Sequence, residues 1–366
     1  MNIAVQYWNE LNPEDIQKAG FNSVEIRAGK ANGLSNLTEK TKRAGLDVQG
    51  INVRLADFWD GKKEVDIKGF QSVLQEIRKS EAKYIIIETE NVTNKSVLLT
   101  LIQECEHQIL GLNIDFYIEN GYVSVNSRFY HCDFSDVKKL KRMANDLNQK
   151  YHKDIFGVCV NVGHANLLGM NVKQMIKEIR GMKGLIHIND NDGQSDQHQM
   201  PYTFTTGRGV MSTDWFRIIG AIITTGFQGR IVFDLSGTFV RTPKKLHLTM
   251  LKLMKAIENE WQNAASTEEY LAEPGKKIIL FGAGKMAQNY MEAWGEQYRP
   301  EFLVDNNKAI QGSERLGIPV KSPEAILEIP DQERNVWICN LYYDEIGAQL
   351  ERMGIAYRCY WDHYFL

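Results

Sequence analysis

The sequence lacks the features that mark several large classes of protein. No apolar run approaches the roughly 18 residues of a membrane-spanning helix, and no block of lysine and arginine interrupts the chain. The formal net charge of −3 offers no basic field of the kind that holds nucleic-acid phosphates. Low-complexity tracts are also missing. We therefore expect neither a membrane partner nor a nucleic-acid partner.

Paired cysteines are missing as well. The cysteines form an odd, scattered set without a C-x-x-C spacing: Cys105, Cys132, Cys159, Cys339 and Cys359. This pattern argues against a disulfide framework and against a zinc knuckle. The first residues carry Glu10, Glu14 and Asp15 in place of the apolar core of a secretory signal. We expect a soluble cytoplasmic protein.

The chain does contain enough apolar sequence for a large core. It has 366 residues, of which 43% are hydrophobic and 10% aromatic. This length exceeds what one hydrophobic core usually supports, so two domains are expected. A small, polar and acidic stretch marks the linker between them. The expected limits are residues 1–263 for the first domain, 264–275 for the linker and 276–366 for the second domain.

Short β-rich runs alternate with longer stretches of helical period in the first domain, which is typical of βα units around a parallel sheet. The predicted strands are Ile3–Tyr7, Ser23–Arg27, Asp47–Val53, Lys83–Glu88, Asp115–Glu119, Phe156–Val162, Gly184–Asn189 and Arg230–Asp234. Between them, amphipathic stretches such as Gly69–Lys79 and Phe134–Gln149 predict covering helices. Segment Tyr122–Cys132 is too long for a plain connection and predicts a hairpin or lid. The pattern predicts a (β/α)8 TIM barrel.

Polar residues gather where the later strands end. Segment 187–198, HINDNDGQSDQH, begins inside a strand-like run and is dense in acids, amides and histidines. Chemistry in such a barrel sits at the carboxyl ends of the strands, where several side chains converge. These ends and the loops after them yield a candidate site: Glu119, Asn161, His164, His187, Asp196, His198 and Asp234. One such residue alone is more often structural, but a set on successive strands predicts a functional pocket.

These residues stand in strings that resemble those of the xylose isomerase-like barrel superfamily. That superfamily includes sugar isomerases, ketose 3-epimerases, inosose dehydratases and endonuclease IV. In chain order the strings are Glu119-Asn-Gly121, Asn161-Val-Gly163-His164-Ala-Asn166, segment 187–198, Gly207-Arg-Gly209 and Asp234-Leu-Ser236. The resemblance covers residues 1–263, and the ordered set is more specific than any single string.

The resemblance implies a divalent ion, which is Zn, Mn, Co or Mg, held by Glu, Asp, His and Glu from strands five to eight. Such an ion polarises a carbonyl and hydroxyl pair, so that the adjacent C–H becomes acidic enough for a carboxylate base. Carried over, the ligands are Glu119, Asn161, His187 and Asp234. The expected catalytic residues are Glu119 and Asp234 as the acid/base pair, with His187 as an orienting residue.

Two of these positions depart from the family pattern. Asn161 offers one neutral carbonyl oxygen where the family has a charged Asp. Asp234 is one methylene shorter than the family's Glu, so its oxygens retract from the centre. Both changes weaken the binding of a hard cation.

A second metal position is complete. Through the resemblance to endonuclease IV, one of its zinc positions maps onto His164, Asp196 and His198, and three N/O ligands with an open position suit Zn²⁺. The other histidines of that trinuclear centre have no counterparts near Asn52 or Glu88. An endonuclease activity is therefore disfavoured.

The second domain begins with a strand, a glycine-rich turn and a helix. The motif Gly282-x-Gly284-x-x-Ala287 has the context of a dinucleotide fingerprint, in which the helix amino end accepts phosphate. Asp305 closes the next strand, where a ribose-binding acid belongs. The region from Lys276 resembles small Rossmann-like domains attached to sugar-modifying enzymes of polysaccharide pathways. It predicts a nucleotide or nucleotide-sugar site; the alternative is a structural or dimerising domain.

The leading functional hypothesis is a sugar isomerase or epimerase of carbohydrate metabolism that acts by carboxylate-mediated proton transfer, with or without a metal. The competing hypothesis is a non-catalytic carbohydrate- or nucleotide-sugar-binding protein of polysaccharide biosynthesis. An endonuclease IV-like hydrolase ranks third. The expected partner is a sugar or sugar phosphate, and the sequence leaves a homo-oligomer open.

Overall fold

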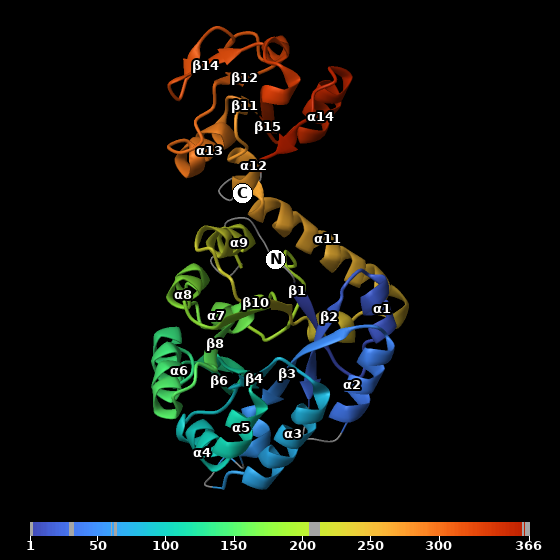
Figure 1. Ribbon diagram of the computed structural model, residues 1–366, viewed down its shortest axis with the longest axis vertical. Coiled ribbons are helices and arrows are strands. Elements are labelled where there is room, and N and C mark those ends of the chain that lie inside the picture. The colour runs from blue at the N-terminus through green and yellow to red at the C-terminus, as the bar shows by residue number, and fades with distance from the viewer. Residues whose placement is uncertain are drawn as a thin grey trace. The chain divides into compact units, whose positions relative to one another are not determined.

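The structure is a computed structural model that describes residues 3–28, 33–59, 61, 64–204, 213–360 and 362. The chain forms two compact units, Met1–Asn259 and Glu260–Leu366 (Figure 1). The division lies inside helix α11 (His247–Ala265), and helix α12 (Thr267–Leu271) spans part of the segment 264–275 that we expected as a linker. That segment is therefore largely helical.

The first unit is built on a closed barrel of parallel strands, which confirms the predicted (β/α)8 fold (Figure 1). The strands follow one another around the barrel in the order β1-β10-β9-β8-β5-β4-β3-β2. Their bounds are β1 (Ile3–Tyr7), β2 (Ser23–Ala28), β3 (Asp47–Arg54), β4 (Tyr84–Glu88), β5 (Asp115–Glu119), β8 (Phe156–Asn161), β9 (Gly184–Ile188) and β10 (Arg230–Phe233). Pairing of Ile3 with Ile231 closes the ring.

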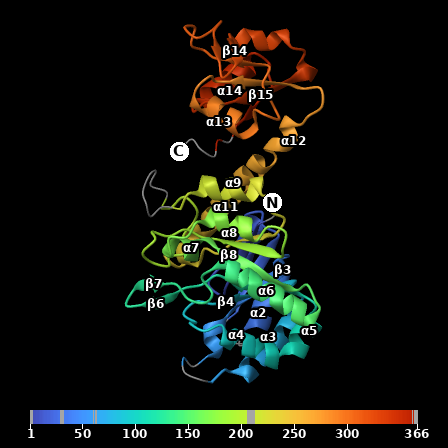
Figure 2. The same cartoon turned by 90° about the vertical axis from the view of Figure 1, so that its left-hand side faces the viewer.

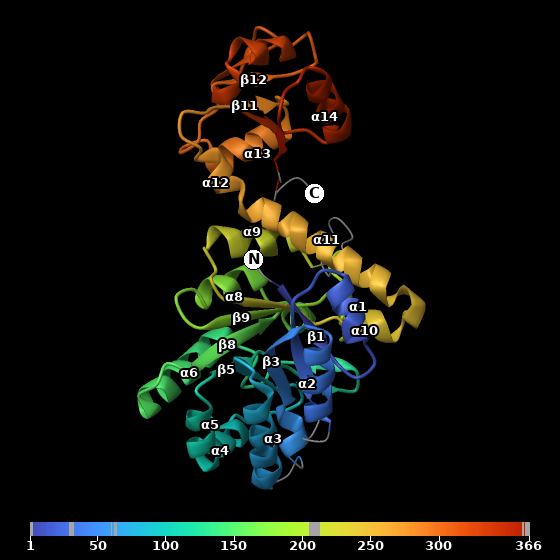
Figure 3. The ribbon, with the colours of Figure 1, turned by 45° about the vertical axis from the view of Figure 1, so that its right-hand side comes forward.

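Helices surround these strands because each carries one apolar face. In α3 (Ile67–Ser80) the buried residues Phe70, Val73 and Ile77 recur at helical spacing, and Asp66 caps the amino end by accepting from Gly69 N at 2.8 Å. Figure 3 shows α3 beside α2 (Leu34–Arg43) on the outside of the barrel. The other helices of this unit are α1 (Pro13–Lys18), α4 (Ser96–Glu104), α5 (Glu106–Leu112), α6 (Val137–Tyr151), α7 (Val162–Leu167), α8 (Val172–Glu178), α9 (Trp215–Thr224) and α10 (Ser236–Val240), with 3-10 turns at Leu55–Phe58 and Lys244–Leu246.

A hairpin follows β5, within the segment that predicted a hairpin or lid. Strands β6 (Val123–Val125) and β7 (Arg128–Tyr130) pair antiparallel. The turn residues Asn126 and Ser127 both have positive φ, as a tight two-residue turn between twisted strands requires. The hairpin projects from the side of the barrel (Figure 2).

The second unit is a small α/β domain. Its sheet has the order β13-β14-β12-β11-β15-β16 and is parallel except for the β13–β14 pair. Alternate residues of β11 enter different cores, Ile278 and Leu280 in one and Ile279 and Phe281 in the other, so both faces are covered. The elements are β11 (Lys277–Phe281), β12 (Phe302–Val304), β13 (Glu314–Arg315), β14 (Ile318–Lys321), β15 (Arg334–Ile338), β16 (Arg358–Cys359), α13 (Lys285–Trp294) and α14 (Tyr343–Arg352), with 3-10 turns at Pro323–Glu328 and Asp331–Glu333.

Across the described part of both units, no helix has the length and apolar character that crossing a bilayer demands.

Candidate active site at the carboxyl ends of the barrel strands

Buried acids and histidines meet at one end of the barrel. Glu88 and Glu119 are the last residues of β4 and β5, and Asp234 directly follows β10. Parallel strands bring these ends together. The three carboxylates are at most 3% exposed, and His187, near the end of β9, is fully buried. Burial of so many ionisable groups is costly unless they are paired or bind a ligand, which makes this end the candidate site.

Some residues of segment 187–198 stabilise the loop, and others belong to the candidate site. Asp190 accepts hydrogen bonds from Phe204 N and Trp215 Nε1, and Asp192 accepts from Ser195 N at 2.8 Å in a local turn. These acids hold the loop. Three other members of the segment pair with the buried acids at this end: His187, Asp196 and His198. The Gly207-Arg-Gly209 string, which is part of the resemblance noted above, lies outside the described residues.

Four side chains form what we call the outer cluster: Glu90, His164, Asp196 and His198. One ligand atom from each lies within 4.8 Å of all the others. His164 Nε2 is 3.1 Å from Glu90 Oε1, and His198 Nε2 is 3.2 Å from Asp196 Oδ2. The sequence predicted three of these residues together. It missed Glu90, which follows β4 by two positions, although an acid directly after a buried strand is a signal that points to it.

The histidines of the outer cluster are oriented as metal ligands are. His164 Nδ1 donates to the Asn120 carbonyl at 2.8 Å, and His198 Nδ1 lies 3.2 Å from the Asp234 carbonyl. A carbonyl oxygen only accepts, so His164 Nδ1 carries a proton, and Nε2 is the ring nitrogen that faces the cluster. Such a backbone contact fixes the tautomer of metal-binding histidines in general.

Several buried polar atoms of the cluster have no hydrogen bond within the described part of the chain: Glu90 Oε1, His164 Nε2 and Asp196 Oδ1. Burial alone lowers the pKa of His164, but the close contact of its Nε2 with Glu90 Oε1 and the field of Glu119 outweigh burial and raise that pKa to about 10. The surrounding carboxylates thus stabilise positive charge at this position. A divalent cation fits both the donor set and the charge.

The inner group consists of Glu25, Glu119, Asn161 and His187. His187 Nδ1 is 2.6 Å from Glu119 Oε1, and its Nε2 is 3.2 Å from Glu25. Both ring nitrogens therefore contact carboxylates. Burial lowers the pKa of His187, but the effects of Cys159, Glu25 and Glu119 outweigh it and raise that pKa well above its usual value. Coordination of a metal by His187 would require one of these contacts to break. Glu119 and His187, with Cys159, also lie close enough to share an ion.

Asn161 has a structural reason for its identity. Its Oδ1 caps α7 by accepting from His164 N at 3.1 Å and also accepts from Asn189 Nδ2 at 3.0 Å. Its Nδ2 donates to Glu119 Oε1 at 3.1 Å. The amide thus orients Glu119, which leaves the second oxygen, Oε2, without a hydrogen bond among the described residues.

Asp234 links the inner group with the outer cluster. Its Oδ2 lies 3.0 Å from His198 Nδ1 and 3.9 Å from His187 Nδ1. Burial raises the pKa of Asp234, but the His198 imidazolium outweighs burial and holds that pKa below the usual range. Glu119, His187 and Asp234, which the sequence predicted as one set, thus lie together, and Asp234 is paired most closely with His198.

Two further residues at this end escaped the sequence prediction. Arg27, on β2, pairs with Glu88 at 3.2 Å and offsets part of the negative charge. Burial raises the pKa of Glu88 to about 7 even with Arg27 beside it. Tyr122, at the base of the β6–β7 hairpin, donates to Asp196 Oδ2 at 2.8 Å and packs edge-on against His164, with ring centroids 5.0 Å apart.

Comparison with known proteins identifies the fold. No protein-family model and no curated protein sequence matches the chain. A solved L-ribulose 3-epimerase aligns with a TM-score of 0.52 and 14% identity, over 74% of this chain and 97% of its own. The first unit has the fold of the xylose isomerase-like TIM barrels. A D-allulose 3-epimerase from Methylomonas sp. aligns with a TM-score of 0.51 and 10% identity, over 71% of this chain and 98% of its own.

In the second unit, the glycine-rich turn has the predicted strand–turn–helix context. Gly282 has a φ of +117°, and a Cβ there would lie 2.3 Å from the Cys339 carbonyl. Gly284 precedes α13, and Ala287 is fully buried within that helix. Asp305 accepts from Ala283 N at 3.0 Å and from Asn307 N at 2.9 Å. One of its oxygens therefore braces the glycine-rich turn and the other the turn after β12, and the nucleotide site stays a prediction.

Proposed function

We propose that the chain is a sugar isomerase or epimerase that moves a proton at a carbon next to a carbonyl. The observation that carries this proposal is the buried Glu119. One of its oxygens is fixed by His187 and Asn161, and the other has no hydrogen bond among the described residues. A carboxylate held in this way is prepared to accept a proton from carbon. The fold is shared with sugar epimerases, which agrees with the proposal.

The outer cluster is the proposed metal site, with Glu90, His164, Asp196 and His198 as ligands. A divalent ion bound there would polarise the substrate's carbonyl and hydroxyl oxygens and so acidify the adjacent C–H. The expected ion is Zn, Mn, Co or Mg. Of these, Zn suits two imidazole nitrogens and two carboxylates best.

The chain's own residues supply the proton transfers. Glu119 takes the proton from the substrate carbon at Oε2, while His187 and Asn161 hold its other oxygen in place. Return of a proton on the other face falls to Asp234. Its carboxylate is ionised at rest, so it first takes a proton from His198 Nδ1, which lies 3.0 Å from Asp234 Oδ2, and then donates that proton to carbon. Burial of these side chains excludes water from the reacting carbon.

The proposal is tested by exchange of substrate hydrogen with solvent. Ketopentoses, ketohexoses and their phosphates are incubated in D₂O with the metal-loaded protein, and deuterium at carbon is followed by NMR. We expect incorporation with at least one sugar, and a loss of roughly 10³-fold in rate for Glu119→Gln. The exposed Glu104→Gln is the matched control. Equal rates for wild type and Glu119→Gln on a verified substrate would remove Glu119 from the mechanism.

A non-catalytic binding protein is the second candidate. Both nitrogens of His187 and the oxygen of Asn161 are engaged within the protein, so two of the four family ligands are committed elsewhere. Under this alternative the barrel binds a carbohydrate or nucleotide-sugar without turnover. Thermal stabilisation by nucleotide-sugars, with no deuterium exchange into any sugar, favours it over the isomerase.

A further inference from the structure

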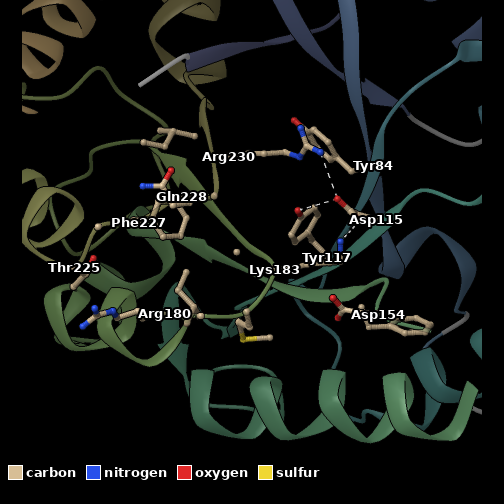
Figure 4. A pocket seen from close by; sticks show the side chains of 18 of the residues that line it. Tyr84, Asp115, Tyr117, Asp154, Arg180, Lys183, Thr225, Phe227, Gln228 and Arg230 are labelled. Atoms are coloured by element: carbon tan, nitrogen blue, oxygen red, sulfur yellow. Dashed lines mark hydrogen bonds and ion pairs between the residues drawn. The ribbon is translucent and has the colours of Figure 1, made fainter. Parts of the chain in front are cut away.

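A cavity of about 1010 Å³ lies at the other end of the barrel, among the amino ends of the strands (Figure 4). Its wall includes the first residues of four strands, namely Tyr84 of β4, Asp115 of β5, Gly184 of β9 and Arg230 of β10. A buried apolar cluster fills the barrel interior and includes Ile86, Leu185 and Val232. These residues lie one or two positions further along their strands, between the cavity and the active-site end.

The charged side chains of the cavity are centred on Asp115. Lys183 Nζ is 2.8 Å from Asp115 Oδ1, and Arg230 Nη2 is 3.4 Å from Asp115 Oδ2 (Figure 4). The Tyr117 hydroxyl donates to the same carboxylate at 3.4 Å. Arg180 and Asp154 also line the cavity. Cations therefore outnumber carboxylates in this wall, although the whole chain carries a net charge of −3.

Arg230 is held in place but is weakly engaged. Its guanidinium lies over the Tyr84 ring, 5.0 Å from the centroid, and its contacts with Gln49 Oε1 and Asp115 Oδ2 are both 3.4 Å long. Charge-assisted hydrogen bonds are typically about 2.7–2.9 Å, and a guanidinium has five donors. Its side chain is 37% exposed. The guanidinium is therefore already in position for an oxyanion, which could approach its nitrogens more closely than the 3.4 Å of the Asp115 contact.

The rest of the wall suits an organic ligand. Phe227 and Ile179 supply apolar surface, and Gln49 and Gln228 supply amide groups. Gly184 and Gly229 leave room for the Phe227 ring in this wall, because neither has a side chain. A Cβ on Gly229 would lie 2.2 Å from that ring. The volume matches that of a pocket for a small metabolite.

We propose that this cavity is a binding site for a small organic anion, whose carboxylate or phosphate lies between Arg230 and Lys183. The ligand's oxygens replace the long Arg230–Asp115 contact, and its body rests against Phe227. The site is separate from the proposed active site, so its occupation does not depend on the isomerase activity.

The test uses the full chain, freed of divalent ions, in calorimetric titrations with succinate and with glycerol 3-phosphate at constant ionic strength. We expect saturable binding of one of them, and the preferred probe identifies the carboxylate or the phosphate as the recognised group. Arg230→Gln should weaken that binding by about ten-fold or more. The matched control, Arg43→Gln, removes the same charge from the exposed helix α2 and should bind like wild type.

Asp115→Asn gives an effect of opposite sign. The Asp115 carboxylate competes with the ligand for Arg230 and Lys183, so its removal should tighten anion binding several-fold. If Asp115 had only a structural role, its removal would not tighten binding. If Arg230→Gln does not fold, Lys183→Gln takes its place. Absence of saturable binding by either probe, or equal affinities for wild type, Arg230→Gln and Asp115→Asn, would overturn the proposal.

Discussion

The two ends of the barrel are built from the same strands but carry opposite charge. Along β5, the residues that alternate on one face run Asp115, Tyr117, Glu119, and the corresponding run through β10 is Arg230, Val232, Asp234. At the carboxyl end, carboxylates exceed cations, and buried oxygens such as Glu119 Oε2 lack hydrogen bonds in the described structure. At the amino end, two cations share Asp115. One set of strands can therefore carry a cation site at its carboxyl ends and an anion site at its amino ends, with an apolar layer between the two sites.

The largest expected effect is at the carboxyl end. Glu90→Gln should lower Zn²⁺ affinity at least about 100-fold, because it removes one charged ligand of the outer cluster. Competition with a chelating dye measures the affinity. Glu104→Gln, an exposed change of the same type, should leave it unaltered. Unchanged affinity in Glu90→Gln would show that the excess negative charge at this end does not serve a metal.

The next prediction tests why Asn161 is neutral. Asn161→Asp keeps the cap on α7 but replaces the donor to Glu119 Oε1 by a second carboxylate. We expect a loss of about 1–3 kcal/mol in metal-free unfolding free energy, largely restored by Mn²⁺. Urea denaturation measures both. Asn171→Asp, at the exposed cap of α8, is the control and should be close to neutral. Equal losses of unfolding free energy for the two substitutions would contradict the idea that a second carboxylate at position 161 repels Glu119.

At the amino end the same kind of change should cost less. Arg230→Gln should reduce the unfolding free energy by no more than about 1 kcal/mol, because the side chain is 37% exposed and Lys183 still pairs with Asp115. Urea denaturation beside Arg43→Gln provides the measurement. A loss as large as that of Asn161→Asp would mean that this ion pair supports the fold more than it serves a ligand.

The smallest effect concerns the layer between the two ends. Burial raises the pKa of Cys159, a member of that layer, to about 12, so almost no thiolate exists at pH 8. Iodoacetamide should therefore label the exposed Cys359 in the native protein and leave Cys159 unmodified until urea unfolds the chain. Peptide mapping by mass spectrometry reads out both sites. Labelling of Cys159 in the native protein at the same rate as Cys359 would show that the reagent reaches the apolar layer inside the barrel.

Much of the barrel could be predicted because its signals are local. Each strand is a short β-rich run between helical periods, and parallel strands place their last residues at one end, so Glu119, His187 and Asp234 were predicted as neighbours. Glu90 was missed because it lies beyond the strand in a turn, where periodicity has no bearing. Asp305 occupies the position of a ribose-binding acid, yet both of its oxygens contact backbone N–H groups of nearby turns.

The sequence by itself determined the order of strands and helices and the residues that stand at the strand ends, because both depend on spacing along the chain. Only the tertiary structure decided how those residues are paired. Whether a nitrogen of His187 faces Glu119, Glu25 or a metal depends on distances of a few tenths of an ångström between separate strands. The same holds for the cavity around Asp115, since its residues come from strands far apart in the sequence and acquire a common charge only when the barrel closes.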